Sequence, residues 1–482
     1  MAGWNDLPTE LRLAILELLA EDPGLQDPAA GKRPLSCYVC VCREWQDVFE
    51  KRNFAHIRLS PACLRAFSRL VRPRSMIRHI WLCINLKTYN CVKCYVSHEI
   101  SDIYSSKVLV GETISNLFYI LSRWCLTDTE NGNGISLEIS AHAPGDYRDA
   151  FGSRAFQVAY TAPYDPIEQC NCLDPHVTDT RSISIIRLFT LPMTLLPELT
   201  LPMVGVVTTL IVRRQTHRQF SAESYSRIVC HLPNLRYIRH ETWRELSRSS
   251  QPVMDADNRK LLWTVFPQTL KSLSLFKDFN EHFIYEFHGP AEFHDELFRD
   301  IDPSVGFALA AKSQRLEHLS AGFIVDATSF FIGIRRNWGW DNLLTLALTS
   351  NLFQPDMDLE GVNELLFLAG KAALKMPQLR VMELWNGGHG FGSIFRYDRR
   401  DDFASVTWLS SVLKLQFRVG VVDVWNEVAH HHDRPGVRFF VETLDRNGLL
   451  SHGDTINMLV LRYEVLDPMS LYQIVMEGRY YS

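Results

Sequence analysis

The segment Leu270-Lys-Ser-Leu-Ser-Leu275 places leucine at its first, fourth and sixth positions. Similar spacing of apolar residues recurs in four further segments: LRYI at 235–238, LEHL at 316–319, LLTLAL at 343–348 and LRVMEL at 379–384. Successive side chains of a β-strand point to opposite faces, so the fourth and sixth positions share one face. Each segment therefore predicts a short strand with one buried face.

These segments predict a repeated unit, because helical patterns lie between them. Apolar residues follow a helical period over 359–375, and a second helix is expected over 221–232, where Ser221 can cap its first turn. The L-x-x-L-x-L spacing resembles the strand half of a leucine-rich repeat, in which stacked strand–helix units share one core. Weaker copies begin at Ile77, Val207 and Ile456, and strands are expected there too.

The spacing of the units departs from a strict repeat. The five clear copies begin 35, 46, 27 and 36 residues apart, whereas leucine-rich repeats recur every 20 to 29 residues. The sixth position of the first unit is His240 rather than an apolar residue. An irregular α/β body with leucine-rich strands is the alternative, and the sequence leaves it open.

In a repeat array, the positions that alternate with the buried leucines would face a ligand. They mix polar groups with aromatic side chains, a composition that suits protein recognition. We expect a protein substrate to contact Tyr237, Arg239, Phe276, His318, Glu383 and Trp385. Neighbouring outward positions are Ser272, Ser274, Ser320, Thr345 and Thr349.

The N-terminal region predicts two helices. Residues 7–20 read LPTELRLAILELLA, in which Pro8 suits a first turn and apolar residues fall on most of the circumference. Such a helix must be covered by its own domain or by a partner. A loop is expected over 22–34 and a second helix over 35–50, LSCYVCVCREWQDVFE.

Leu-Pro-x-Glu-Leu at 7–11, Ile15-Leu16 and Val41-Cys42-x-x-Trp45 resemble the F-box, and residues 1 to about 95 are similar to F-box proteins of filamentous fungi. The resemblance implies a substrate-recognition subunit of a ubiquitin ligase that binds a Skp-type adaptor and, through it, a cullin, without being an enzyme itself. The implied core and adaptor-facing residues are Leu7, Pro8, Leu11, Ile15, Leu16, Val41, Cys42 and Trp45. Two alternatives stay open: a small helical cap of the body, and an F-box-like scaffold that works outside any ligase.

The expected fold class is therefore α/β, with an N-terminal helical F-box followed by an irregular leucine-rich-repeat-like solenoid. The expected domains are an F-box at 1–55, a linking region with an irregular insertion at 56–200, and the repeat body at 201–482. Within the linking region, alternating residues predict a strand at 134–140, and 144–172 is rich in turn residues.

Composition excludes several classes of partner. The formal charge of -5 gives no basic excess for nucleic acid, and the longest apolar run, Val204 to Val212, is too short to span a membrane. The eleven cysteines are an odd number and all lie before residue 231, unlike a secreted disulfide framework. We expect reduced thiols and a cytoplasmic or nuclear location.

No cofactor or metal is expected. Cys91 and Cys94 have the C-x-x-C spacing of a zinc site, but the second pair, Cys37 and Cys40, lies in a predicted helix; Cys170, Cys172 and His176 are a further possibility. Local thiols are the simpler interpretation. The His430-His-His432-Asp433 run predicts an exposed loop, and the glycine-rich 387–392 predicts a long turn rather than a phosphate loop.

Overall fold

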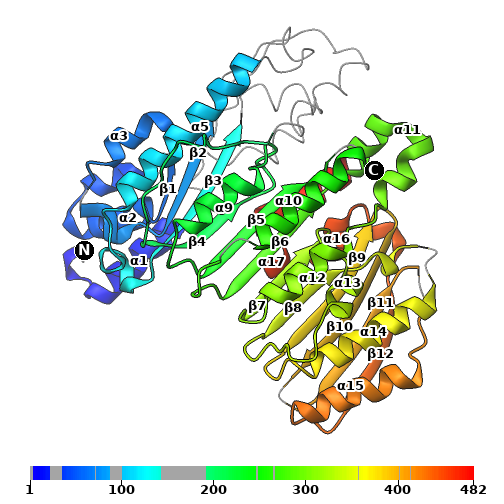
Figure 1. The fold of residues 1–482 in the computed structure, drawn as a ribbon. Helices are drawn as coiled ribbons and strands as arrows, with labels where there is room; N and C mark the ends of the chain where they lie inside the picture. Colours follow the sequence, from blue (N-terminus) through cyan, green and yellow to red (C-terminus); the bar gives the residue numbers. More distant parts are fainter. Residues whose placement is uncertain are drawn as a thin grey trace.

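A computed structural model describes residues 4–21, 35–70, 72–86, 100–142, 192–245, 248–263, 266–355, 358–400, 402–412 and 414–481. These residues form a mixed α/β fold around one twelve-stranded sheet. Strand order in the sheet equals strand order in the chain, so the strands follow one another across the molecule from blue to orange (Figure 1). The α/β class expected from the sequence is confirmed.

The strands are short. They are β1 His56–Leu59, β2 His79–Asn85, β3 Ile135–His142, β4 Val207–Val212, β5 Tyr237–Trp243, β6 Ser272–Asp278, β7 His318–Gly322, β8 Thr345–Thr349, β9 Val381–Gly388, β10 Phe391–Arg399, β11 Ala404–Ser410 and β12 Val437–Thr443. Strands β2 to β9 follow the predicted segments, whereas β1, β10, β11 and β12 were not predicted. Each of β1 to β8 pairs in parallel with the next strand, so β1 to β9 form a parallel series. β10 pairs antiparallel with both β9 and β11, and β12 is parallel to β11. The expected long turn at 387–392 is wrong. It is a tight hairpin between β9 and β10, in which Gly390 takes a φ of 74°.

The fourth positions of the repeated segments form a ladder through the parallel strands. Ile238, Leu273, Leu319, Leu346 and Met382 are aligned in register across β5 to β9, and all are buried in one core. Backbone hydrogen bonds also join the second residues of successive units, just before the strands begin. In each unit the N–H of the second residue donates to the carbonyl of the second residue in the preceding unit; Lys271, for example, donates to Arg236 at 2.8 Å. The fourth positions face the core as predicted, but most of the positions that alternate with them are buried as well, so the expected exposed face is wrong for β6 to β9.

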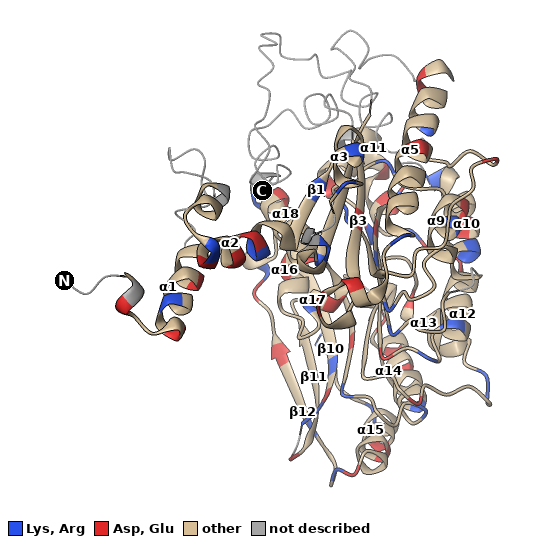
Figure 2. Ribbon diagram, turned by 90° about the vertical axis from the view of Figure 1, so that its left-hand side faces the viewer, with Lys and Arg blue, Asp and Glu red and all other residues tan. Residues whose placement is uncertain are grey.

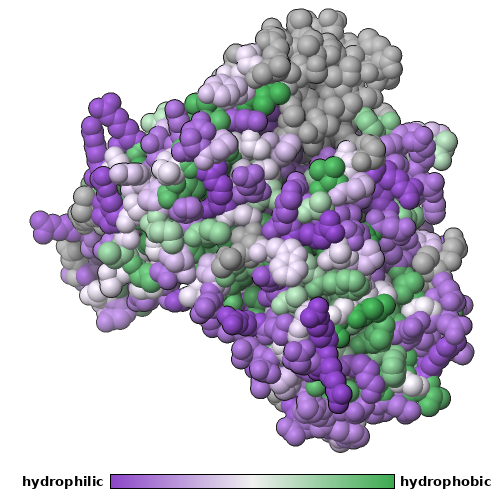
Figure 3. Space-filling view, viewed as in Figure 1, coloured by the Kyte–Doolittle hydropathy of each residue, from purple (hydrophilic) through white to green (hydrophobic). Residues whose placement is uncertain are grey.

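Most helices that connect the strands lie on the core side of the sheet (Figure 2). The connecting helices are α3 Leu64–Phe67, α5 Ile100–Leu121, α9 Ala222–Cys230, α10 Gln251–Trp263, α11 Glu281–Leu297, α12 Pro303–Lys312, α13 Ala327–Ile332, α14 Leu359–Ala373 and α15 Val419–His431. Helix α9 begins after Ser221, whose hydroxyl accepts from the N–H of Ser224, as expected. Seen from this side the surface is mainly hydrophilic, with apolar patches over the part formed by α12 to α15 (Figure 3).

The uneven spacing of the units has a simple structural cause. One helix, α13, fits into the interval of 27 residues between β7 and β8, whereas two helices, α11 and α12, fill the interval of 46 between β6 and β7. Helix α11 also contains a break at Gly289, with φ 73°, followed by Pro290. The extra length is therefore an insertion on an otherwise regular strand stack.

The end of the chain folds back over the opposite face of the sheet. Helices α16 His452–Asn457, α17 Arg462–Val465 and α18 Pro468–Tyr481 make up this C-terminal cover, which lies across from the connecting helices (Figure 2). The strand expected at Ile456 to Leu461 is wrong, because these residues belong to the end of α16 and to the turn that precedes α17. Apolar side chains at a spacing of three suit a helix as well as a short strand.

Candidate functional site

Two surfaces are candidates for function: the N-terminal helix pair and the face of the sheet opposite the connecting helices. In the first, α1 Thr9–Glu21 packs on α2 Arg43–Ala55 around Leu16, Ala20 and Phe49. The Nε of Arg12 donates to Oε1 of Glu44 at 2.9 Å, joining the two helices at their edge. The pair extends away from the sheet on the side of the C-terminal cover (Figure 2).

Helix α1 leaves much of its apolar surface uncovered. Leu11, Ile15 and Leu18 follow one another at i, i+4 and i+7, and they are 53%, 37% and 69% exposed. Residues at this spacing lie on one face of a helix. Leu13 on another side is 38% exposed, and Val41 before α2 is 57% exposed. The described part of the chain therefore supplies nothing that covers this face.

The predicted second helix, 35–50, is broken, which corrects the sequence-based expectation. A 3-10 helix, Leu35–Cys40, is followed by an extended Cys42 with φ -162°, and α2 begins at Arg43. Cys42 acts as the N-cap residue of α2, and a residue in that position takes an extended backbone. The break leaves both Val41 and Cys42 exposed.

The eight residues predicted for this module separate into core and surface. Leu16 is buried and Trp45 is partly buried, stacking with Phe49 at a ring separation of 5.7 Å. Leu7 is partly buried just before α1, where its carbonyl accepts from Nη1 of Arg12 at 3.0 Å. The exposed members are Pro8, Leu11, Ile15, Val41 and Cys42.

On the second surface, half of the predicted substrate-contacting residues are inaccessible, which corrects the expectation. Phe276, Glu383 and Trp385 do point away from the core, but each is 0% exposed. The C-terminal cover lies over them: Phe276 and Trp385 share a second apolar cluster with Ile456, Leu461 and other residues of the cover. Also buried are Ser274, Ser320, Thr345 and Thr349, whereas Ser272 is partly buried. Tyr237 is 46% exposed, and Arg239 and His318 are partly buried.

Strand carboxylates hold the backbone of the cover. Glu383 of β9 accepts from the N–H groups of Val460 and Leu461 at 3.1 and 2.9 Å and from Nε of Arg396 at 2.6 Å. Glu241 of β5 accepts from the N–H of Asp467 at 2.8 Å. Burial raises the pKa of Glu383 and of Glu241, even though these donors favour their charged forms.

A buried ion network fixes the last helix. Arg214, 0% exposed, donates from Nη1 and Nη2 to the carboxylate of Glu477 in α18 at 2.7 and 2.9 Å, and its Nε donates to Asp278 at the end of β6. His452 of α16 also contacts Asp278 at 3.0 Å. Burial would raise the pKa of Asp278, but Arg214 and His452 bring it below its usual range. The cover is thus an integral layer of the fold.

The part of this face formed by β1 to β3, together with Tyr237 at the start of β5, extends beyond the contacts of the cover that the hydrogen bonds of Arg239 and Glu241 mark. Trp81 of β2 lies between two guanidinium groups, those of Arg58 at 4.8 Å and Arg213 at 5.7 Å from its ring. Arg58 is exposed, Trp81 is partly buried, and Tyr237 of β5 is exposed. Arg58 and Trp81 were not among the predicted contacts. The weak copy that begins at Ile77 was the signal that could have identified Trp81, at its fifth position.

Metal ligands are sparse among the described residues. The one cluster of three is His288, Glu292 and Glu296 in α11, with ligand atoms within 4.8 Å of one another. Glu296 already accepts from Nε of Arg299 at 2.7 Å, and the carboxylates of Glu292 and Glu296 lie at opposite nitrogens of His288. Cys91, Cys94, Cys170, Cys172 and His176 lie outside the described residues. Described cysteines, including Cys37 and Cys40, are free thiols.

The histidine run is not the exposed loop predicted from its sequence. His430 and His431 end α15, and His432 is buried, contacting the hydroxyl of Tyr397 at 2.9 Å and the carbonyl of Met376 at 3.0 Å. Burial lowers the pKa of His432 to about 4, so its ring is neutral at pH 7. The residue has a packing role in the last part of the body.

Comparison with known protein families gives a match for only part of the chain. Residues 265–467 match a family of unknown function, DUF6546. The matched segment begins just before β6 and ends before α18, so it leaves out the N-terminal helix pair and β1 to β5. No curated protein matches the chain. No described helix has the length and apolar character required to cross a membrane.

Proposed function

We propose that the chain is a substrate-recognition subunit of a Skp/cullin/F-box ubiquitin ligase. Helices α1 and α2 form the F-box and dock on a Skp-type adaptor, which connects them to a cullin. The observation that carries this proposal is the uncovered apolar face of Leu11, Ile15 and Leu18. It belongs to the same short segment whose Leu-Pro and Val-Cys-x-x-Trp residues resemble the F-box.

Energetics favour a partner at this face. Fully burying a leucine or isoleucine side chain contributes about 1.5–3 kcal/mol, and exposed apolar patches on soluble proteins commonly mark interaction sites. Leu16 and Phe49 hold the helix pair together without help from the exposed residues. The module is therefore folded before it binds, which lowers the entropic cost of docking.

The body holds the target in this proposal. Its register-aligned strands and outer helices form a leucine-rich-repeat-like solenoid, and the target contacts the part of the strand face that the cover leaves open. Arg58, Trp81 and Tyr237 are the anchors, because aromatic and arginine side chains are enriched where proteins bind one another. The chain performs no reaction; it raises the concentration of the target near the ubiquitin carrier.

The test is a pull-down of the full chain with a Skp-type adaptor and a cullin. The double variant Leu11→Glu/Leu18→Glu changes exposed side chains only, and losing about 3 kcal/mol of burial would weaken adaptor binding about a hundredfold. The matched control is Ile332→Glu in α13, also an exposed apolar position at 61%. It should bind like the unmodified chain.

The same experiment separates the ligase subunit from an F-box-like scaffold. Adaptor and cullin both co-purify with a ligase subunit, whereas a scaffold retains the adaptor without the cullin. Adaptor binding that survives the double variant would contradict the assignment of the docking face to α1.

A further inference from the structure

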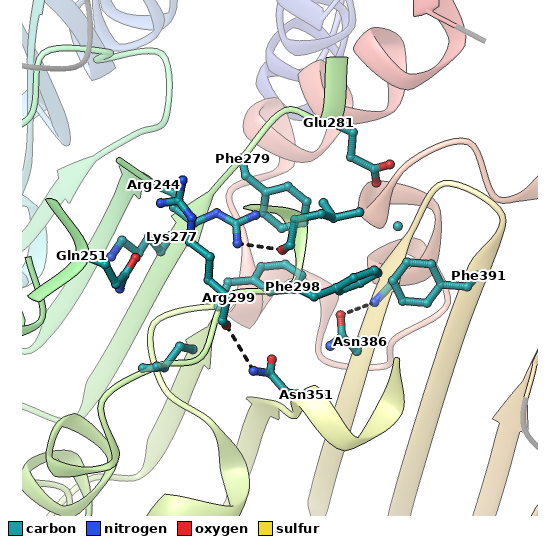
Figure 4. A pocket seen from close by; sticks show the side chains of 15 residues that line it. Arg244, Gln251, Lys277, Phe279, Glu281, Phe298, Arg299, Asn351, Asn386 and Phe391 are labelled. Atoms are coloured by element: carbon teal, nitrogen blue, oxygen red, sulfur yellow. Dashed lines mark hydrogen bonds between the residues drawn. The ribbon is translucent and has the colours of Figure 1, made fainter. Parts of the chain in front are cut away.

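A small cavity lies at the ends of β5, β6 and β9, where these strands meet α10 and the segment after α11. Its volume is about 30 Å³. Three cationic side chains line it, Arg244 after β5, Lys277 of β6 and Arg299 after α11, and phenylalanine rings close its other side (Figure 4). This concentration of positive charge in an enclosed space is unrelated to the docking surfaces described above.

Among the described residues, Lys277 and Arg244 form no ion pair, although the carboxylates of Asp255 and Glu245 favour the charged form of Lys277. Lys277 is only 3% exposed, and among the described residues its ammonium has neither a hydrogen bond nor an ion pair. Arg244 donates from Nη1 to the carbonyl of Leu297 at 2.9 Å, but its Nη2 is buried without a partner. Buried charges are normally paired or bound to an ion, so the arrangement of both groups favours an anion in this cavity.

An acceptor in the same cavity is also unpaired. Gln251 of α10 donates from Nε2 to Oδ1 of Asp255 at 2.7 Å, and a carboxylate can only accept, which fixes the orientation of the amide. Its Oε1 is consequently buried with no donor near it. An occupant that satisfies all three groups must accept from Lys277 and Arg244 and donate to Gln251.

Most carboxylates around the cavity are already engaged: Asp255 accepts from Gln251 at 2.7 Å, whereas Glu245 has no hydrogen bond from a described side chain and favours the charged form of Lys277. Glu296 accepts from Arg299, Asp278 accepts from Arg214 and His452, and Glu281 accepts from the N–H of His389 at 2.8 Å. The lining therefore carries three cationic side chains against one carboxylate, that of Glu281. Burial lowers the pKa of Lys277 to about 8, and the neighbouring Arg244 and Arg299 lower it further, although Asp255 and Glu245 favour the charged form.

We propose that this cavity binds a phosphate group, either as inorganic phosphate or as the terminal group of a phosphomonoester. At neutral pH a phosphate offers oxygens that accept from Lys277 and Arg244 and an O–H that donates to the oxygen of Gln251. The volume is about twice what a single water needs, which suits one tetrahedral group and excludes a nucleotide base. Phe298 and Phe391 keep water from the site and so strengthen its electrostatic interactions.

An adjoining cavity gives space for the organic part of a phosphomonoester. A second cavity of about 240 Å³ shares Phe279 and Glu281 with the first and extends between α11 and the C-terminal cover. Comparing inorganic phosphate with glycerol phosphate distinguishes the two sources. Tighter binding of glycerol phosphate assigns the second cavity to the same ligand, whereas equal or weaker binding assigns the site to the free ion.

The experiment is isothermal titration calorimetry of the full chain with inorganic phosphate at constant ionic strength. Lys277→Met and, separately, Arg244→Gln should each weaken binding by about tenfold or more, since each removes one charge-assisted contact. Lys371→Met, an exposed lysine of α14 outside both cavities, is the matched control and should bind normally. Sulfate has no O–H at neutral pH and should bind several-fold more weakly than phosphate.

Stability provides an independent readout. Lys277→Met removes a buried charge that forms no ion pair, so without phosphate its melting temperature should rise above that of the unmodified chain. At a given phosphate concentration, the melting temperature of the unmodified chain should rise more than that of Lys277→Met. The proposal is overturned by any of three results: no saturable binding, undiminished binding in both cavity variants, or sulfate binding as tightly as phosphate.

Discussion

Replacing Arg214 by methionine tests whether the C-terminal cover depends on the buried ion network. The guanidinium is 0% exposed and holds two carboxylates, those of Asp278 and Glu477, which are themselves buried. Removing one partner from a buried ion pair typically costs about 3–5 kcal/mol, because a charge is left without compensation. Arg214→Met leaves two such charges, so a loss at the upper end of this range, about 4–5 kcal/mol, is expected at pH 7.

The loss should depend on pH in a defined direction. Although burial opposes it, Arg214 and His452 lower the pKa of Asp278, so this carboxylate stabilises the unmodified chain above its unfolded pKa and loses that contribution as the pH falls through its folded pKa. Without Arg214 both carboxylates can take up protons and become neutral. The difference in stability between the two chains should therefore shrink on acidification.

Urea denaturation followed by circular dichroism measures the loss, and hydrogen exchange in α16 to α18 locates it. Arg259→Met is the control, since its partner is the half-exposed Asp302 at 3.3 Å and such pairs contribute less than about 1 kcal/mol. Adding Glu477→Gln to Arg214→Met removes one uncompensated charge and should recover part of the loss. A loss below about 1 kcal/mol for Arg214→Met, or one independent of pH, would refute this account of the network.

Three further substitutions have defined expectations. Gly134→Ala should destabilise the chain by about 1–3 kcal/mol in thermal melting, because Gly134 has φ 75° and the added Cβ would lie 2.7 Å from the carbonyl oxygen of Val206. His240→Leu should stabilise it by about 1 kcal/mol in urea at pH 7, since Nε2 of His240 is buried without a partner. That gain should grow below pH 6.5, because burial lowers the pKa of His240 to about 3 and only the unfolded chain takes up the proton; a pH-independent gain would contradict this. Glu383→Gln should speed amide exchange at Val460 and Leu461 about tenfold or more, and unchanged exchange there would exclude Glu383 as their anchor.

Sequence patterns predicted β2 to β9 because alternation is a local property, but they did not predict β1 or β10 to β12. The leucines of 270–275 and their counterparts occupy matching positions in β5 to β9, and Ser221 caps α9 as its residue type suggests. Local patterns also misled at Ile456 to Leu461, where the same apolar spacing belongs to helical residues and a turn. A run of six residues contains too little information to separate the two periods.

The candidate surface was predicted less well because accessibility depends on distant parts of the chain. Trp385 and Phe276 alternate correctly with the buried leucines, yet residues after 451 cover them. Lys277 was not singled out at all, since nothing in SLFKD indicates that its ammonium lies in a cavity with Arg244. Such groupings arise where the ends of neighbouring strands meet at one edge of the sheet, and only the folded chain shows which ends these are.

The order of the strands has a consequence for how the protein is made. Each strand up to β12 pairs with one synthesised just before it, so the sheet can grow as the chain leaves the ribosome. The C-terminal cover is synthesised after every strand it touches, and until then Phe276 and Trp385 face water. A nascent or truncated chain that stops before α16 would display this apolar face to chaperones and proteases. Arrival of the cover would thus mark the moment at which the newly made protein ceases to be a substrate for quality control.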